Sequence, residues 1–287
     1  MDHSFFYLER DYDRLWVSKL IELREDIGMW VAILYVVIII FANTLGAISG
    51  MGGGVIIKPL FELIQVHDIA SISFYSSVAV LTMSCVSTTK QIKNGVSLNW
   101  RMAFQLSIGS IAGGLLGNAL FVYLLNILPR DGYVQMIQII LTIVTLLFSY
   151  WYSSHSDWYY QYQNKWARIF TGVALGGIAS LLGIGGGPIN VAFLMLLFHV
   201  PIKKATVYSI VIILFSQLSK VGSILLQGQW HAFDMRILWA IIPSAVIGGL
   251  LGAQVSKKVS SQVVDKVYKG VIIFVLAVNV YNLIQVL

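Results

Sequence analysis

Long apolar runs separated by short polar segments make up most of the chain. In the first half they lie at about 29–49, 74–93, 102–125 and 133–152, and in the second at about 167–182, 206–227, 236–256 and 267–287. A membrane-spanning helix needs about 20 mainly apolar residues, and most of these runs reach that length. They are continuous rather than alternating, which excludes a transmembrane β-barrel. The pattern therefore predicts an all-α polytopic membrane protein.

Two further apolar pieces are too short to cross a bilayer as helices. They lie at 54–66 and 188–200, have 13 residues each, and each follows a cluster of glycines. Irregular backbone at membrane depth is tolerated only where protein buries it or where it lines a cavity. We therefore expect each piece to be a broken or re-entrant helix.

The chain repeats itself at a nearly constant offset. Gly-Met-Gly-Gly-Gly at 50–54 recurs as Gly-Ile-Gly-Gly-Gly at 183–187, an offset of 133, and Gly-Gly-Leu-Leu-Gly at 113–117 recurs at 248–252, an offset of 135. Such self-similarity indicates a duplicated unit. We predict two homologous repeats of about four spans each, at 29–152 and 167–287. A polar, aromatic linker at 153–166 is expected to lie at the membrane interface between them.

The first 28 residues differ in character from the rest. They mix four basic with seven acidic residues and lack the apolar core of a cleavable signal peptide. Apolar positions recur at roughly helical spacing, which favours an amphipathic helix on the membrane surface at 1–28. A disordered tail is the alternative interpretation.

The orientation of the two repeats depends on whether the short pieces cross the membrane. If they do not, each repeat has four crossings and the repeats are parallel. If they do, each has five crossings and the repeats are inverted. The distribution of Lys and Arg does not separate the two arrangements, and segment length favours the parallel one.

Composition narrows the class of protein further. Hydrophobic residues make up 57% of the chain and charged residues only 11%, against about 25% charged in soluble domains, and mean hydropathy is +0.80. The net charge of +6 comes mainly from basic residues between apolar runs, so it does not indicate nucleic-acid binding. The single cysteine, Cys85, lies in an apolar run and is expected to be a small buried hydrophobe.

The glycine clusters carry the strongest chemical signal. Consecutive glycines are costly inside a helix, so each cluster should break the helix and let something approach the backbone. A helix starting after each cluster would aim free N–H groups and a positive dipole end at an anion, and Pro188 suits a first helical turn. Close helix packing is the alternative. The predicted substrate-binding residues of the breaks are Gly50, Gly52, Gly53, Gly54, Gly183, Gly185, Gly186, Gly187, Pro188 and the polar Asn190 beside them.

Polar and charged side chains follow the glycine clusters. Lys58 and Glu62 lie on one face of the first short piece, where Lys58 could face an anion or could snorkel to the interface. The next span of each repeat carries a polar stripe on one helix face: Ser76, Ser87 and Lys90 in the first, and Ser209, Ser216 and Lys220 in the second. Such stripes suit an anion path. The alternatives are lysines that mark helix ends and serines that join helices.

Catalytic and cofactor chemistry finds no support in the sequence. Glu62 is the only carboxylate in a membrane piece, and no paired acids, metal-ligand motif, nucleophile triad or phosphate-binding loop is present. We therefore expect neither an enzyme nor a cofactor or metal. Any proton coupling would depend on Glu62, on a histidine near the short pieces, or on the substrate itself.

The chain resembles the TauE/SafE sulfite exporter family, also called the toluene sulfonate uptake permease family. The resemblance rests on Ile-Ser-Gly-Met-Gly-Gly-Gly-Val-Ile-Ile-Lys-Pro at 48–59, on Leu-Gly-Ile-Gly-Gly-Gly-Pro at 182–188, and on the duplication. It implies a transporter of sulfite, sulfonates or related anions, and it adds Pro59 to the residues matched. The extension at 1–28 lies outside it.

These observations predict a secondary transporter that exports small sulfur-containing anions by alternating access around the two glycine breaks. We expect a multi-pass protein of a prokaryotic plasma membrane whose partners are a small anion and membrane lipid. The sequence leaves open whether the protein forms a homo-oligomer. The alternatives from other classes are a non-transporting scaffold or accessory subunit and an anion channel.

Overall fold

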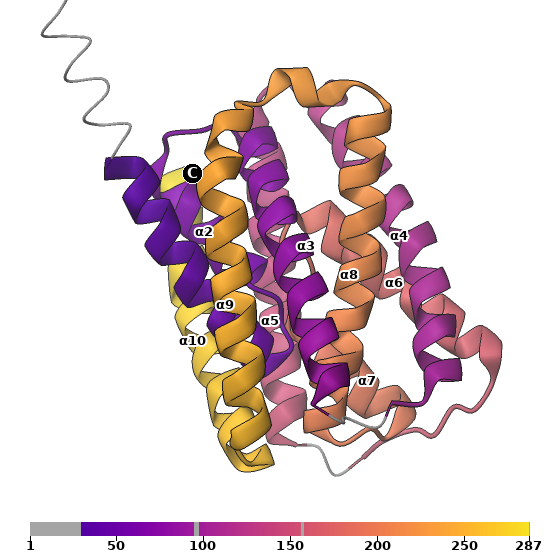
Figure 1. Ribbon diagram of the computed structural model, residues 1–287. Coiled ribbons are helices and arrows are strands. Elements are labelled where there is room, and N and C mark those ends of the chain that lie inside the picture. The colour runs from indigo at the N-terminus through magenta and orange to yellow at the C-terminus, as the bar shows by residue number, and fades with distance from the viewer. Residues whose placement is uncertain (1–29, 95–97, 156–157, 287) are drawn as a thin grey trace, which may run out of the picture.

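The computed structural model describes residues 30–94, 98–155 and 158–286, and within them the chain is helical without β-strands (Figure 1). The surface helix expected at 1–28 lies outside these residues. A helix at Trp30–Ser49 is followed by α2 (Gly54–Ile64), α3 (Ile69–Lys93), α4 (Trp100–Ile127), α5 (Asp131–Ser154), α6 (Lys165–Leu182), α7 (Pro188–Phe198), α8 (Ile202–Leu226), the 3-10 helices Gln229–Ala232 and Met235–Ile237, α9 (Leu238–Lys258) and α10 (Ser261–Val286).

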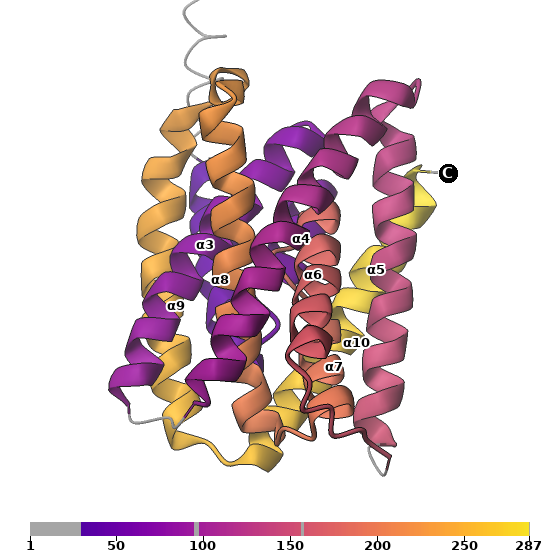
Figure 2. The same cartoon turned by 90° about the vertical axis from the view of Figure 1, so that its right-hand side faces the viewer.

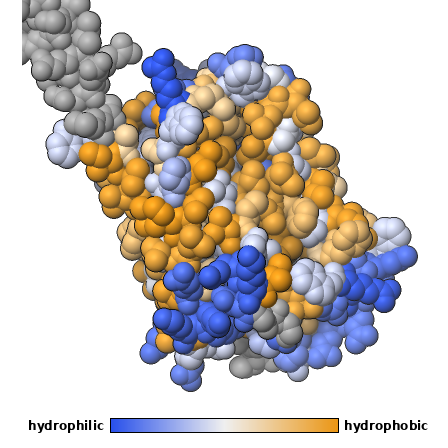
Figure 3. Space-filling view, in the orientation of Figure 1, coloured by the Kyte–Doolittle hydropathy of each residue, from blue (hydrophilic) through white to orange (hydrophobic). Residues whose placement is uncertain are grey.

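Within the described residues, seven helices are long and apolar enough to cross a membrane, and they coincide with most of the predicted apolar runs. They are Trp30–Ser49, α3, α4, α5, α8, α10 and the stretch Met235–Lys258 that contains α9. The span expected at 167–182 forms α6, which has 18 residues and begins with the polar turn that holds Lys165 and Arg168. An apolar surface covers the middle of the molecule (Figure 3).

The centre of the bundle is formed by α3 and α8, which lie side by side (Figures 1 and 2). They are the most buried of the candidate spans, with 72% and 56% of their most apolar windows buried, against 33–39% in the others. These are the helices that carry the polar stripes. Four serines of the stripes and Lys220 are buried, as their polarity requires in a membrane, whereas Lys90 is only partly buried. Cys85 of α3, which was expected to be buried, is exposed.

Each short helix folds back on the helix before it. The ring of Tyr35, near the start of the first helix, stacks on Phe61 of α2 at 3.8 Å. At the opposite end of the bundle, the backbone N–H groups of Tyr160 and Tyr162, just before α6, donate to the carbonyl oxygens of Leu196 and Leu197 near the end of α7. These distances are 2.6 and 3.0 Å. Each pair therefore forms a hairpin that begins and ends at the same end of the bundle.

The two central helices run in opposite directions. Tyr75, near the start of α3, bonds to the backbone of Asp234, which follows the end of α8. Tyr208, near the start of α8, accepts at 2.6 Å from the backbone N–H of Asn99, which follows the end of α3. The opposite directions of α3 and α8 do not fit the parallel arrangement that segment length favoured. That interpretation let Trp30–Ser49 and α6 each cross once, whereas each belongs to a hairpin that returns to its starting end.

The glycines of the two Gly-Gly-Leu-Leu-Gly motifs serve helix packing. A Cβ on Gly113 of α4 would overlap the backbone of Val173 in α6, and one on Gly252 of α9 would meet the backbone of Thr44 in the first helix. Such close approach is typical of small residues at membrane helix interfaces. We call these two glycine-lined helix contacts glycine seams: one packs α4 against α6, and the other packs α9 against Trp30–Ser49.

Basic residues gather at one end of the bundle, the lower end in Figure 3. This end holds the end of α3, the starts of α4, α6, α8 and α10, and the end of α9. Among the described residues its cations are Lys90, Lys93, Arg101, Lys165, Arg168, Lys203, Lys204, Lys257, Lys258, Lys266 and Lys269. The opposite end has Arg130 and Arg236 together with Asp68, Asp131 and Asp234.

Candidate anion site at the two glycine breaks

The two glycine clusters form the turns between the paired helices, and the turns meet inside the bundle. A Cβ on Gly52 would lie 3.6 Å from the carbonyl oxygen of Gly185, and one on Gly54 would overlap the carbonyl of Ile184. Gly52 and Gly185 have φ angles of 77° and 70°, a region that residues with a side chain rarely adopt. Glycine is therefore required both for the backbone conformation and for the contact between the turns.

Both short helices start at this meeting point. α2 begins at Gly54, and the backbone N–H groups of Ile56 and Ile57 donate to the Gly53 carbonyl at 3.0 and 2.9 Å. α7 begins at Pro188, which has no N–H to leave unpaired. The first N–H groups of a helix have no partner within it, and its N-terminus carries a partial positive charge. Two positive helix ends therefore converge on one place.

Three buried polar side chains beside the turns have no hydrogen-bond partner among the described residues. They are Asn43 of the first helix, Ser76 of α3 and Asn190 of α7, each 0% exposed. A Cβ on Gly53 would overlap the amide of Asn43, and one on Gly186 would lie 3.2 Å from the amide nitrogen of Asn190. An unsatisfied buried polar group costs about 1–3 kcal/mol. A bound anion would accept from the two amide nitrogens and the Ser76 hydroxyl, whereas the two amide oxygens are acceptors themselves.

Asn43 is a candidate that the sequence analysis missed. Its only sequence signal is its isolation, as an amide within the apolar run 29–49. It lies seven residues before Gly50, about two helical turns, which aims it back along the face that leads to the break.

The central helices form the walls around the turns. A Cβ on Gly185 would overlap Val80 of α3, and one on Gly186 would overlap Ile213 of α8. The hydroxyl of Ser209 donates to the Gly50 carbonyl at 2.6 Å. The site thus combines the backbone N–H groups at two helix N-termini, side-chain hydroxyls and side-chain amides with apolar walls. This combination is typical of ligand sites.

The two buried lysines bind the end of α6. The Nζ of Lys58 donates to the carbonyl of Leu182 at 2.7 Å and to Oε1 of Gln138 at 2.6 Å. The Nζ of Lys220 donates to the carbonyl of Ser180 at 3.1 Å. The lysines are 3% and 1% exposed, so Lys58 does not snorkel and Lys220 does not mark a helix end. Both positive charges therefore lie at the negative C-terminal end of α6, directly before the second break.

The other stripe residues lie further from the breaks or bond within their own helix. Ser216 donates to the carbonyl of Ile213. Ser87 accepts from the amide of Gln91, and Lys90 lies in the last turn of α3. At 1.5 Å per residue, Ser87 and Lys90 are about 10 and 15 Å along α3 from Val80. Of the predicted stripe, only Ser76 and Ser209 reach the turns directly.

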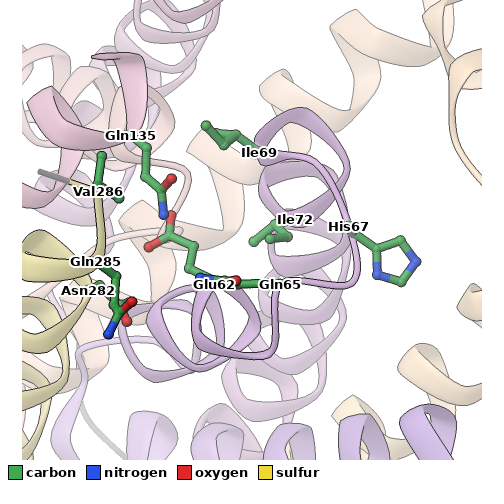
Figure 4. Close-up of a pocket in the computed structure, with 9 residues that line it drawn as sticks. All are labelled: Glu62, Gln65, His67, Ile69, Ile72, Gln135, Asn282, Gln285 and Val286. Atoms are coloured by element: carbon green, nitrogen blue, oxygen red, sulfur yellow. The ribbon is translucent and has the colours of Figure 1, made fainter. Parts of the chain in front are cut away.

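Glu62 lines a separate cavity of about 170 Å³ at the end opposite the basic one (Figure 4). One of its oxygens lies 3.5 Å from Nζ of Lys58 and has no hydrogen-bond partner among the described residues. The amide side chains of Gln135 and Asn282 point toward the same space, and Asn282 also donates to the carbonyl of Pro59 at 2.9 Å. The cavity therefore gives small species a route to a carboxylate that contacts a site lysine.

His67 lines the rim of this cavity, between α2 and α3. Its Nδ1 lies 2.8 Å from the hydroxyl of Tyr35. Partial burial lowers the pKa of the imidazole below its ordinary value, although the nearby Asp68 and Asp234 oppose that shift. The net shift favours the neutral form of His67, and Glu62 is the carboxylate among the described residues that line the cavity. In the part of the chain that the structure describes, no group of three or more His, Cys, Asp or Glu could hold a metal ion.

Comparison with known proteins identifies relatives over nearly the whole chain. The family model of the sulfite exporter TauE/SafE matches residues 35–281. The chain is 23% identical over 271 residues to the probable membrane transporter protein YunE of Bacillus subtilis, covering 85% of this chain and 95% of that protein. It is 22% identical over 241 residues to a probable membrane transporter protein of Methanocaldococcus jannaschii, covering 79% and 87%. No solved structure matches the chain.

Proposed function

The chain belongs to the sulfite exporter TauE/SafE family and is a multi-pass membrane transporter, and from this premise we propose that it exports small sulfur-containing anions such as sulfite or organosulfonates as a secondary transporter. The site we propose is the space around the two glycine turns.

The observation that carries this proposal is the set of unpartnered donors at the turns. Asn43, Ser76 and Asn190 are fully buried and have no hydrogen-bond partner in the part of the chain that the structure describes, and the N-termini of α2 and α7 converge beside them. An oxyanion accepts several hydrogen bonds at once and is favoured at a positive helix end. Lys58 and Lys220 would add positive charge while they hold the end of α6.

We propose alternating access between two inverted repeats as the mechanism. Helices at equivalent positions support it: α2 and α7 have 11 residues each, and α3 and α8 have 25 each and run in opposite directions. In transporters built this way, one repeat moves against the other around a central site made by broken helices. The two hairpins, which enter from opposite ends and meet at their tips, would be the moving parts.

We place the basic end of the bundle in the cytosol and assign the protein to the plasma membrane. Lys and Arg concentrate at that end among the described residues, as the positive-inside rule requires of cytosolic loops. The start of the helix at Trp30 then lies on the outer side. The cavity at Glu62 opens on that side as well, which suits proton entry from outside.

We further propose that Glu62 couples transport to protons. Protonation of Glu62 would remove the negative charge 3.5 Å from Lys58, and so change how firmly Lys58 holds the carbonyl of Leu182 before the second break. Intramembrane carboxylates are costly and are typically retained for such roles.

Uptake of radiolabelled sulfite into proteoliposomes tests the proposed function. We expect saturable uptake above that of empty liposomes, faster when a pH gradient is imposed across the membrane. Uptake equal to that of empty liposomes with sulfite, thiosulfate and small sulfonates alike would overturn the transport proposal and favour a scaffold. Rates far above those of carriers would indicate a channel.

A further inference from the structure

A second, larger hollow lies at the basic end, away from the glycine turns. It has a volume of about 470 Å³ and is lined by Arg101 and Gln105 of α4, by Gln163 and Asn164 of the linker, and by Lys165 and Arg168 of α6. None of the described residues that line it is a carboxylate. The cavity thus joins three cations from the first turns of two neighbouring helices.

The polar groups of this cavity are only partly used by the protein. Nη1 of Arg168 donates to Oε1 of Gln105 at 3.0 Å, but its buried Nε has no partner among the described residues. Arg101 and Lys165 are exposed. The N-termini of α4 and α6 also point to this end and add positive potential. The arrangement matches an anion with several oxygens, such as a phosphate.

The aromatic residues around the cavity are typical of the membrane interface, where the lipid headgroups lie. Trp100 and Trp166 flank it in sequence and are 60% and 54% exposed, as aromatic residues at a membrane interface are. One turn further into the helices, Phe104 and Phe170 are 66% and 67% exposed and belong to the apolar surface. A ligand with a phosphate headgroup and acyl chains could therefore place its headgroup in the basic cavity and its acyl chains on the adjacent apolar surface.

We propose that this cavity binds the headgroup of an anionic phospholipid of the cytoplasmic leaflet. Basic pockets between membrane helices on the cytosolic side are where such lipids bind. The phosphate accepts from Arg101, Lys165 and the free Nε of Arg168, and the acyl chains lie on the lipid-facing surface beside Phe104 and Phe170. The lipid joins the starts of α4 and α6, the two helices that the glycine seam already packs together. This inference does not depend on what the protein transports.

Thermal unfolding of the detergent-solubilised protein tests it, with phosphatidylglycerol, phosphatidylcholine or inorganic phosphate titrated in. We expect a saturable rise in Tm with phosphatidylglycerol alone. In the variant Arg101→Gln/Lys165→Gln/Arg168→Gln, the lipid concentration for the half-maximal shift should rise by about a hundred-fold, since each cation contributes about 1 kcal/mol. The control Lys257→Gln/Lys258→Gln/Lys266→Gln removes equal charge from exposed positions at the same end and should behave as wild type.

Two results of the lipid titration would contradict the proposal. An equal shift with phosphatidylcholine would show that headgroup charge is irrelevant. An equal shift with inorganic phosphate would indicate a site for a soluble anion instead of a lipid. If the triple variant does not fold, Arg101→Gln is titrated in its place, because Arg101 is exposed, and it should raise the half-maximal concentration about fivefold. An unchanged value would overturn the proposal.

Discussion

Replacing Gly53 and Gly186 together by leucine is expected to reduce anion transport at least about 100-fold, a loss of roughly 3 kcal/mol in the binding or crossing of the substrate. A Cβ on Gly53 would overlap the Asn43 amide, and one on Gly186 would overlap Ile213. Gly186 also has a φ of 126°, which strains any residue with a side chain. The leucines would fill the space between the turns and bury the donors that we assign to the anion.

The matched control is Gly270→Leu in α10. An added Cβ there meets no atom of the described residues within 4 Å, so this leucine should leave transport unchanged. Membrane insertion and a single symmetric size-exclusion peak must be shown for both variants before uptake is compared. Transport by the double variant at the control's rate would show that the anion does not pass between the turns.

Exchanging Asn43 and Asn190 together for leucine is expected to abolish transport while raising the thermal stability of the protein. Both amides are buried and have no partner within residues 30–94, 98–155 and 158–286, and each unsatisfied group costs the folded state about 1–3 kcal/mol. Leucine has a similar size and removes that cost. It also removes two donors for the substrate, so stability and function should move in opposite directions, which a purely structural role for the amides does not predict.

The unfolding temperature without added anion, followed by tryptophan fluorescence, should rise by several degrees in this variant. The control is Asn279→Leu in α10, a buried asparagine whose amide nitrogen donates to the Val275 carbonyl at 2.8 Å. Because that amide is satisfied, its loss should not stabilise the protein and should leave transport intact. If the Asn43/Asn190 variant instead lost stability, or transported sulfite normally, the amides would not be ligands of the substrate.

The helices and the two breaks follow from local sequence features. Apolar runs of sufficient length specify spans, and the three consecutive glycines at 52–54 and at 185–187 lie where the helix is interrupted, so both could be predicted from residues alone. The glycine pairs at 113–114 and 248–249 stay inside α4 and α9. The family resemblance also follows from the two glycine motifs, and the match over 35–281 confirms it. The meeting of the two turns brings Gly52 close to the Gly185 carbonyl, a contact between distant parts of the chain that no local pattern specifies.

The direction of the two halves and the partners of the lysines could not be predicted in this way. Whether a helix crosses or returns depends on contacts such as the stacking of Tyr35 on Phe61, which no local pattern encodes. Lys58 and Lys220 lie far from Leu182 and Ser180 in sequence, and only the packing of α6 brings those carbonyls to them. Asn43 was missed for the same reason, because its importance arises from the turn that packs beside it.

The location of the anion is tested most directly by a crystal of the protein soaked with selenite, which has the shape and charge of sulfite and scatters X-rays anomalously. The account predicts one strong anomalous peak between the glycine turns, within about 3 Å of the donors of Asn43, Ser76 and Asn190. A peak confined to the basic cavity between α4 and α6, or no peak at the turns although selenite competes with sulfite for transport, would contradict it.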